Sequence, residues 1–421
     1  MVIIMEHFES AQPTFAEQLE EYLPTQADIM RKKSGTVRLR TLIISSVCCL
    51  LAGAVIALAV VPNALRNPLS KDVTDKLLLI DSYIDAYYID ADKTDKQILA
   101  DTAAWGYVSG LGDIYSTYYD AKSYADAIYS NSGGSHGIGI SAVYYGGIYI
   151  VRVTNNSPAQ NAGLKAKDVI TAVDGEKVTE ENYPQLIEAI RGDKDTKVKL
   201  TVLRDGKESQ IEATRGEYTV ESVRSRMIGT TGVITITGFN QATTEQFKDS
   251  LEWVQSKGAK ALILDVRGNG GGLVNETNQV LDLLLPKCEI GYALYKSGNK
   301  VVLGKSDKKC VELPMCVLTD DQTASSAEYF ASALRDSGNA TLVGEKTFGK
   351  GIMQSTFSLG DGSAIKLTVA KIYTASGYEF HLNGLEPDIK ASYTEEQLKT
   401  WFLLTDSEDP YIQAALKKLE K

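Results

Sequence analysis

The sequence predicts an α/β protein core that contains an inserted, strand-rich domain, preceded by a helical segment and a single transmembrane helix. From about residue 232 to residue 393, strand-like and helix-like runs alternate, which is typical of a layered α/β core. Residues 136–216 change to the two-residue period of strands. Residues 41–61 carry no charge. A chain of 421 residues is long enough for two or three domains of this kind.

The composition excludes some classes of function. The formal net charge is −10, whereas a protein whose main partner is nucleic acid needs a basic face. The apolar fraction of 43% and charged fraction of 23% are ordinary for a globular protein and argue against disorder. The five cysteines do not have the spacing of a metal site. We therefore expect no nucleic-acid partner, no metal and no organic cofactor.

The first 61 residues predict a membrane anchor. At about 1.5 Å per residue, a helix over residues 41–61 would span roughly 30 Å, the thickness of the hydrocarbon core. Five basic residues precede it, namely Arg31, Lys32, Lys33, Arg38 and Arg40. The positive-inside rule then places residues 1–40 in the cytoplasm and everything after Pro62 outside. A signal peptide and a buried core helix are the alternative interpretations.

After a linker at residues 62–72, residues 73–135 have a helical pattern. Apolar residues recur there at spacings of three and four, namely Leu77, Ile80, Ile84 and Tyr87. This spacing also fits a helix packed against the chain's own core. The run S-N-S-G-G-S at residues 130–135 predicts a loop at the boundary of the next domain.

The block 136–216 begins with G-I-G-I, which is Gly137, Ile138, Gly139 and Ile140. Glycines in a loop that enters an apolar strand leave backbone N–H groups free for a peptide's terminal carboxylate. Taken alone, the motif is better explained by a glycine-bearing turn. Residues 147–153 and 197–206 alternate like strands, and residues 182–192 form an amphipathic helical pattern.

The segment D-V-R-G-N-G-G-G-L, residues 265–273, follows a strand-like run and precedes a helix-like one. Glycines at such a position expose backbone N–H groups that bind an anion, either a phosphate or an oxyanion. The segment lacks the G-K-[ST] of a phosphate-binding P-loop. A tight structural turn is the alternative interpretation.

The segment T-A-S-S-A-E-Y-F, residues 323–330, places Ser325 and Ser326 between a buried strand and a helix. This setting can present a nucleophilic serine beside backbone N–H groups. Ser325 and Glu328 also form a capping box, which requires no catalysis. None of the three histidines, His7, His136 and His381, is near in sequence. A lysine kept neutral by burial could act as the base, and Lys346 and Lys350 are the candidates.

A longer run, residues 155–178, resembles a PDZ domain. The hallmark S-P-A-x-x-A-G-L-x-x-x-D-x-I-x-x-x-[DN]-G is matched by Ser157, Pro158, Ala159, Ala162, Gly163, Leu164, Asp168, Ile170, Asp174 and Gly175. The resemblance implies that residues 136–216 are a PDZ domain. It also implies that Gly137, Ile138, Gly139 and Ile140 receive the C-terminal tail of a partner.

Five further segments resemble the carboxyl-terminal-processing (tail-specific) serine proteases in order and spacing. They are LILDVRGNGGG, TASSAEYFASAL, LVGEKTFGKGIMQ, LTVAKIYTASG and GLEPDI. The resemblance runs from about Leu77 to the C-terminal helix, and LGDIYSTYY at residues 111–119 matches the family's segment before its PDZ domain. It implies a peptidase core at residues 217–421 and a homodimer through the helices of residues 73–130.

The resemblance also implies the roles of individual residues. The family's catalytic serine and lysine lie 25 residues apart, which is the separation of Ser325 and Lys350, and Gln354 follows at the position of the family's glutamine. Backbone N–H groups of Ser326 and Gly271 would form the oxyanion hole. The implied protein is a membrane-anchored serine endopeptidase that works by a Ser–Lys dyad and an acyl-enzyme. Its catalytic part would be extracytoplasmic, and its partners would be proteins or peptides with exposed C-termini.

The sequence departs from the family pattern in two segments. Because Ser325 and Lys350 are both present, we interpret these departures as tuning of substrate choice or rigidity and not as loss of activity. The family's S-A-S-A-S-E is T-A-S-S-A-E here, and its T-P-S-G-R is T-A-S-G-Y at residues 374–378. The alternatives are an inactive PDZ scaffold, a non-proteolytic enzyme on the same core, and a conventional triad based on His381. Arg191 and Arg152 are both candidates for the arginine by which such a PDZ domain positions the site. One disulfide or none could form among Cys288, Cys310 and Cys316.

Overall fold

The computed structural model of the protein describes residues 71–307 and 309–420. Within these ranges, residues 71–110 belong to one compact unit and the residues from 111 onward to another. The first unit contains α4 (Lys71–Tyr87), η1 (Ala91–Lys93) and α5 (Lys96–Ser109). Asp95 caps α5, and Lys96 forms ion pairs of 2.6 Å with both Asp81 and Asp85 of α4. Within this unit, the predicted apolar face of α4 remains largely exposed.

The structure corrects the predicted fold class and localisation. A helix needs about 20 apolar residues to cross a bilayer. Among the described helices none qualifies, and the longest, α4, has 17 residues of which six are charged. The predicted transmembrane helix at residues 41–61 lies outside the described residues, as does the predicted tail at residues 1–40. The single transmembrane helix, the membrane partner and the single-pass location in the cytoplasmic membrane are therefore withdrawn.

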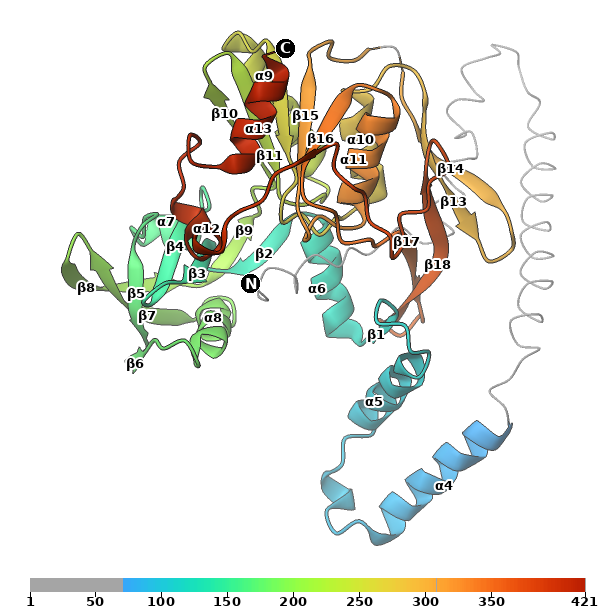
Figure 1. Cartoon of the computed structure of the whole chain (residues 1–421). Coiled ribbons are helices and arrows are strands. Elements are labelled where there is room, and N and C mark those ends of the chain that lie inside the picture. Colours follow the sequence, from blue (N-terminus) through green and yellow to red (C-terminus); the bar gives the residue numbers. More distant parts are fainter. Residues whose placement is uncertain (1–70, 308, 421) are drawn as a thin grey trace, which may run out of the picture. The chain divides into compact units, whose positions relative to one another are not determined.

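The second unit is built around a six-stranded sheet in the order β10-β11-β12-β15-β16-β19 (Figure 1). Its strands are β10 (Val223–Ile228), β11 (Thr231–Ile236), β12 (Ala261–Asp265), β15 (Met315–Thr319), β16 (Ala340–Gly344) and β19 (Ile389–Lys390). All neighbouring strands are parallel except β10, which is antiparallel to β11. The carboxyl ends of the parallel strands therefore meet at one edge of the sheet.

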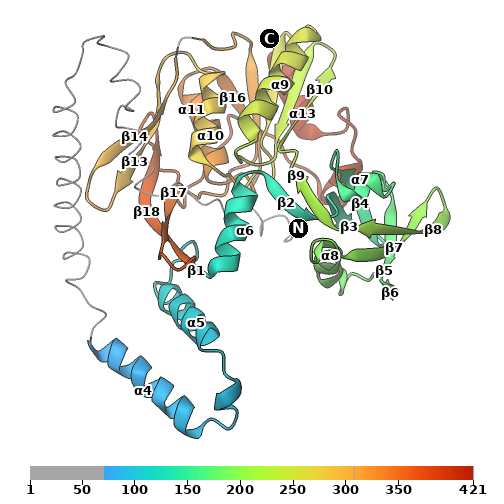
Figure 2. The ribbon, with the colours of Figure 1, turned by 180° about the vertical axis from the view of Figure 1, so that it is seen from behind.

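Helices cover both faces of this sheet, which explains why its central strands β12 and β15 are buried along their whole length. One face packs on α9 (Thr243–Ser256), α10 (Val274–Asp282) and α11 (Ser326–Asp336). The other face packs on α13 (Pro410–Leu419), which is in front of the sheet in Figure 1, while α9 is in front in the reverse view of Figure 2. Adjacent residues of one strand point to opposite faces. Leu262 of β12 belongs to the core cluster on the side of α9, α10 and α11, and Ile263 belongs to the core cluster on the side of α13.

A second sheet of five antiparallel strands lies beside this core. It contains β1 (Thr117–Tyr119), β13 (Glu289–Tyr295), β14 (Lys300–Lys305), β17 (Ile352–Ser358) and β18 (Ala364–Thr374). The central strand β18 pairs with the preceding strand β17 and with β1 and β13, which come from distant parts of the chain. The short α12 (Glu395–Thr400) and η2 (Trp401–Leu403) precede α13.

The inserted domain has its own sheet and its own core. The strands are β3 (Ile140–Tyr144), β4 (Ile148–Val153), β5 (Val169–Val173), β6 (Glu176–Lys177), β7 (Lys197–Arg204) and β8 (Lys207–Thr214), with α7 (Pro158–Asn161) and α8 (Tyr183–Arg191). Both ends of the domain leave through a two-stranded ribbon of β2 (Gly134–Gly137) and β9 (Gly216–Thr219). The ribbon continues through α6 (Ala121–Asn131) on one side and β10 on the other.

Candidate active site

The two serines of T-A-S-S-A-E-Y-F have different surroundings at the start of α11. Ser326 is buried, and its Oγ donates a hydrogen bond to the carbonyl of Gly272 at 2.8 Å. Ser325 is only half-buried, and its φ is 57°, a region that non-glycine residues rarely occupy. A strained turn from a strand to a helix is a known way of presenting a nucleophilic serine. The geometry therefore distinguishes Ser325 as the more accessible of the two hydroxyl groups.

Glu328 connects the turn at residues 323–326, here called the serine turn, to the loop at residues 346–351, here called the lysine loop. Its fully buried carboxylate accepts backbone N–H groups from Ser325 at 2.9 Å, Gly349 at 2.8 Å and Lys350 at 2.7 Å. It also accepts the hydroxyl of Thr347. Burial raises the pKa of Glu328, although these hydrogen bonds act to lower it. The glutamate of the predicted capping box thus also fixes the backbone of Lys350 relative to Ser325.

The two candidate lysines have different environments. The side chain of Lys346 is more than half exposed and forms an ion pair of 3.2 Å with Glu386, so it behaves as a surface lysine. Lys350 is half-buried, and its Nζ lies 4.2 Å from the centroid of the Tyr115 ring. Gln354 follows on β17, where its Nε2 donates to Thr368 Oγ1 at 3.1 Å.

The glycine loop packs directly against the serine turn. Gly271 has a φ of 106°, and a Cβ at this position would lie 2.8 Å from Ser325 Cβ and 2.9 Å from the backbone nitrogen of Ser326. Only glycine permits this approach. The loop is held there by a hydrogen bond from the Ala324 N–H to the carbonyl of Asn269.

The backbone N–H of Gly271, a predicted oxyanion donor, is occupied in this conformation. It donates to Asn269 Oδ1 at 2.8 Å, while the side-chain amide nitrogen of Asn269 donates to the carbonyl of Ile236. An oxyanion that uses this N–H would therefore take the place of the asparagine oxygen.

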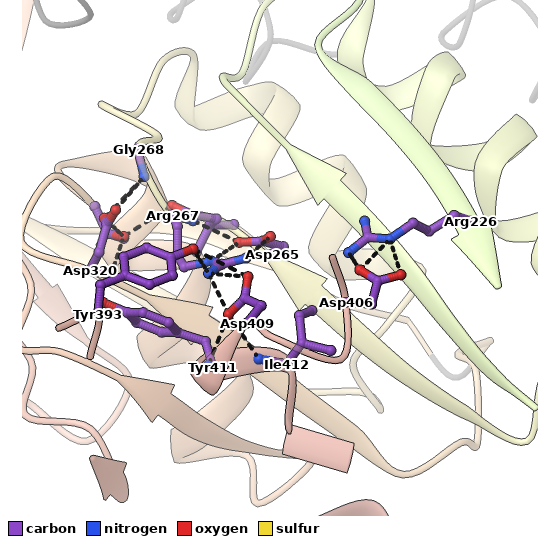
Figure 3. Close-up of polar contacts among 12 residues, drawn as sticks. Arg226, Asp265, Arg267, Gly268, Asp320, Tyr393, Asp406, Asp409, Tyr411 and Ile412 are labelled. Carbon is purple, nitrogen blue, oxygen red and sulfur yellow. Dashed lines mark hydrogen bonds and ion pairs between the residues drawn. The ribbon is translucent and has the colours of Figure 1, made fainter. Parts of the chain in front are cut away.

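A buried ionic network anchors the base of the glycine loop (Figure 3). The guanidinium of Arg267 donates to Asp265 at 2.8 Å, to Asp409 at 2.9 Å and to the hydroxyl of Tyr393 at 2.7 Å. It also lies 4.7 Å from the centroid of the Tyr411 ring. Burial acts to raise the pKa of Asp265, but the charge of Arg267 holds that pKa below its ordinary value. The network links the loop to the C-terminal helix α13.

Asp320 makes a second connection between the loop and the serine turn. Its carboxylate accepts the Gly268 N–H at 2.9 Å and the Thr323 hydroxyl at 2.9 Å. Burial raises the pKa of Asp320, in spite of these hydrogen bonds. The loop and the turn are thus joined on both sides of Ser325.

In the inserted domain, the predicted peptide-binding residues lie between β2 and β3. Ile138 is buried and its carbonyl accepts the Ala159 N–H, while Gly139 has a φ of 81° and accepts the Thr154 N–H. Ile140 begins β3, and Gly137 ends β2 beside the backbone of Arg191. These contacts fix the loop at the entrance of β3.

The structure also shows the surroundings of the candidate arginines, Arg191 and Arg152, and of the alternative base, His381. Arg191 forms an ion pair of 2.9 Å with Glu188 on the same helix. Arg152 donates to Ser141 at 3.1 Å, and burial lowers the pKa of its guanidinium. The Nδ1 of His381 is buried without a hydrogen-bond partner, whereas a triad histidine needs an acidic group at that nitrogen.

Within residues 71–307 and 309–420, no cluster of three His, Cys, Asp or Glu side chains is placed to hold a metal ion. The thiols of Cys288, Cys310 and Cys316 are free, and burial raises the pKa of Cys316 to about 11.

Sequence reasoning missed three features of the site. They are the contact of Tyr115 with Lys350, the second role of Glu328, and the network around Arg267. Tyr115 and Lys350 are far apart in the chain, so local periodicity gives no signal for their contact. The family-like segment at residues 111–119 was the one available indication.

Comparisons with known proteins identify two domains of the chain and several relatives. Residues 230–391 match peptidase family S41, and residues 134–214 match a PDZ domain. The "Carboxy-terminal processing protease CtpA" of Bacillus subtilis (strain 168) is 40% identical over 306 residues, covering 71% of this chain and 65% of that protein. The "Probable CtpA-like serine protease" of Staphylococcus haemolyticus (strain JCSC1435) is 33% identical over 306 residues, covering 71% of this chain and 61% of that protein. Less than two thirds of each relative is therefore spanned.

Among solved structures, the "Putative S41 protease" of Bacteroides fragilis NCTC 9343 has the same fold. It is 18% identical with a TM-score of 0.50, and the match covers 69% of this chain and 82% of that one. The family match, the PDZ match and the curated relatives together establish that the chain belongs to peptidase family S41, carries a PDZ domain and is a homologue of the carboxy-terminal processing proteases.

Proposed function

We propose that the protein is a serine endopeptidase in which Ser325 and Lys350 form the catalytic dyad. The observation that carries the proposal is the Glu328 carboxylate, which accepts the backbone N–H of both residues and so holds their segments together. The half-buried position of Ser325 and its strained backbone also support this role. An inert helix cap would need neither feature.

In the proposed reaction, the neutral amine of Lys350 takes the proton of Ser325 as Oγ attacks the scissile carbonyl. The lysine then gives this proton to the leaving amine, and water hydrolyses the acyl-enzyme. Backbone N–H groups of Ser326 and Gly271 would stabilise the tetrahedral oxyanion. For this, the Gly271 N–H would exchange its bond to Asn269 for one to the oxyanion. Gln354 would orient the lysine from β17.

The PDZ domain is proposed to capture the C-terminal tail of a protein or peptide substrate. The tail would add as a strand beside β3, with its carboxylate at Gly137, Ile138, Gly139 and Ile140. In the structure, the hydroxyl of Tyr183 on α8 donates to the carbonyl of Ala142 on β3 at 3.2 Å. A tail that pairs with this carbonyl would displace Tyr183.

Cleavage of an unfolded protein by the purified full chain tests the dyad. Ser325→Ala and Lys350→Ala should each lower kcat by at least a thousandfold, since the nucleophile or its base is lost. Ser326→Ala and Lys346→Ala are matched controls, because Ser326 contributes a backbone group and Lys346 pairs with Glu386 at the surface. Full activity of Ser325→Ala would refute the assignment, and an inactive wild type would favour a PDZ scaffold.

A further inference from the structure

The segment between the first unit and the PDZ domain reaches the dyad lysine. Its strand β1 pairs with β18 so that Thr117 lies opposite Lys366. The strand that follows Lys350, β17, pairs with the same β18 and places Gln354 opposite Thr368. Residues 113–116 are therefore held beside the lysine loop by the sheet itself.

One side chain of this segment that contacts the amine of Lys350 is Tyr115. Its ring centroid lies 4.2 Å from Lys350 Nζ. A ring face attracts the ammonium form of lysine through its quadrupole and does not attract the neutral amine in the same way. The contact therefore favours the protonated state of Lys350.

Asp113 adds a negative charge next to the same lysine. Its carboxylate accepts the Ser116 hydroxyl at 2.6 Å and the Tyr115 N–H at 3.0 Å. Burial acts to raise the pKa of Asp113, but hydrogen bonds from Ser116, Thr368 and Tyr115 and the charge of Lys350 hold it below the ordinary value. Asp113 is thus ionised at neutral pH, and its attraction to Lys350 is mutual.

The same hydrogen bonds extend to Gln354. The backbone N–H of Thr368 donates to Ser116 Oγ at 3.1 Å, and Thr368 Oγ1 accepts from Gln354 Nε2 at 3.1 Å. Thr368 also donates its hydroxyl to Asp113. The carboxylate is therefore fixed by the residues that surround the dyad and does not rotate freely into solvent.

We propose that Asp113 and Tyr115 are positioning residues that hold Lys350 as the ammonium ion and so set the pH above which the dyad has a neutral base. To become the base, Lys350 releases one proton to solvent. Two further ionisable residues lie beside the backbone of the lysine loop. They are Glu328 of α11, whose carboxylate accepts the backbone N–H of Lys350, and His381, whose backbone packs on Gly351. The proposal rests on the proposed function, since it concerns the same lysine.

The test is the pH dependence of kcat/KM for Asp113→Asn, measured on the full chain with β-casein as the unfolded substrate. Removing the carboxylate should move the acidic limb of the pH profile, where kcat/KM rises with pH, to lower pH by about one unit or more. At a pH below this limb, kcat/KM of the variant should then be about tenfold or more above that of the wild type. The matched control is Asp120→Asn, because Asp120 caps α6 nearby and asparagine preserves a cap. An unshifted limb in Asp113→Asn, or an equal shift in the control, would overturn the proposal.

Tyrosine variants test the ring independently, in case Asp113→Asn does not fold. Tyr115→Leu should also move the acidic limb to lower pH, and Tyr115→Phe should restore the wild-type limb because it keeps a ring face. The control is Tyr119→Leu, which removes a ring from Lys366, a lysine outside the dyad, at 5.6 Å. A limb that is unchanged by Tyr115→Leu would remove the ring from the proposal.

An NMR titration separates this inference from the proposed function. The Lys350 signal of lysine-labelled protein, identified by its loss in Lys350→Met, should titrate at lower pH in Asp113→Asn than in wild type. If the Lys350 midpoints of wild type and Asp113→Asn are equal and the wild type cleaves β-casein, the inference is refuted and the peptidase function is left intact. If the midpoint is lower in Asp113→Asn than in wild type but the wild type does not cleave β-casein, the inference is supported and the proposed function is refuted.

Discussion

At Glu328, one buried carboxylate accepts hydrogen bonds from the backbone of Ser325 and of Lys350. Two further donors, Gly349 and Thr347, complete its surroundings. A carboxylate has two oxygens with lone pairs enough for four such donors, whereas an amide has one oxygen and an NH₂ group that cannot accept. Glutamine at this position would leave some of these buried donors without a partner.

We therefore expect Glu328→Gln to lower the free energy of unfolding by about 1–3 kcal/mol and kcat by at least tenfold. The difference from wild type should depend on pH. Because the folded pKa of Glu328 is raised above its ordinary value of 4.5, its stabilising contribution is fully present below that value and is lost as pH rises through the folded pKa. Denaturant unfolding of both proteins should thus give a larger difference at acidic than at neutral pH. A difference that grows with pH would contradict this.

Only some of the hydrogen bonds of Glu328 can be predicted from the sequence. The pattern S-x-x-E predicts the hydrogen bond between Glu328 and the Ser325 N–H, because both ends lie within one helical turn. The bonds to Gly349 and Lys350 could not be predicted, since they depend on how a distant loop packs. In the sequence, only the family resemblance distinguished Ser325 from Ser326. The physical difference between the two, which is the strained φ of Ser325 and the burial of Ser326, is seen only in the structure.

At the scale of elements, the Arg267 network joins the glycine loop to α13. Arg267→Met would leave Asp265 and Asp409 buried without their counter-charge, which should cost about 3–5 kcal/mol of unfolding free energy. It should also lower kcat more than it raises KM, because the loop carries Gly271. Thermal unfolding and kinetics measure both effects.

The matched control is Arg226→Met. Arg226 pairs with Asp406 at 2.7 Å, but both side chains are about 40% exposed, so its loss should cost less than about 1 kcal/mol (Figure 3). Equal losses for the two variants would mean that burial of the Arg267 network does not matter.

Periodicity predicted the elements whose partners are nearby. Residues 147–153, 182–192 and 197–206 were read correctly as strand, helix and strand, and the structure has β4, α8 and β7 there. The short strand β1 was not predicted, because it lies in a segment read as helical and is stabilised by pairing with β18, more than 200 residues away. The transmembrane helix expected at residues 41–61 is not part of the described fold.

At the scale of the whole molecule, the PDZ domain is an insertion with adjacent ends. Gly137 and Gly216 lie opposite each other at the end of the β2–β9 ribbon. The core clusters of the peptidase sheet contain no residue of the inserted domain, which has a separate core. The residue pattern predicted the insertion, whereas the ribbon that supports it depends on pairing between distant residues.

Replacing residues 138–215 by an Asn-Gly turn should therefore leave a cooperatively folded peptidase core, because this turn suits a two-residue hairpin loop. Its cleavage should no longer distinguish peptides with a free C-terminal carboxylate from the same peptides with an amide. Calorimetry and paired peptide assays measure these two outcomes. Loss of cooperative unfolding would mean that the core needs the inserted domain to fold.

The ribbon also determines where a mechanical load on the PDZ domain is carried. β2 enters the domain and β9 leaves it at the same end of the ribbon. A force that pulls the domain away from the core therefore acts on both strands in the same direction and does not shear one strand against the other. The tension in β9 passes through three residues to the edge strand β10, and that in β2 passes along α6 to β1. Tyr115 stands just before β1, over Lys350. A force applied to the PDZ domain would thus be transmitted along the backbone to the residue that contacts Lys350.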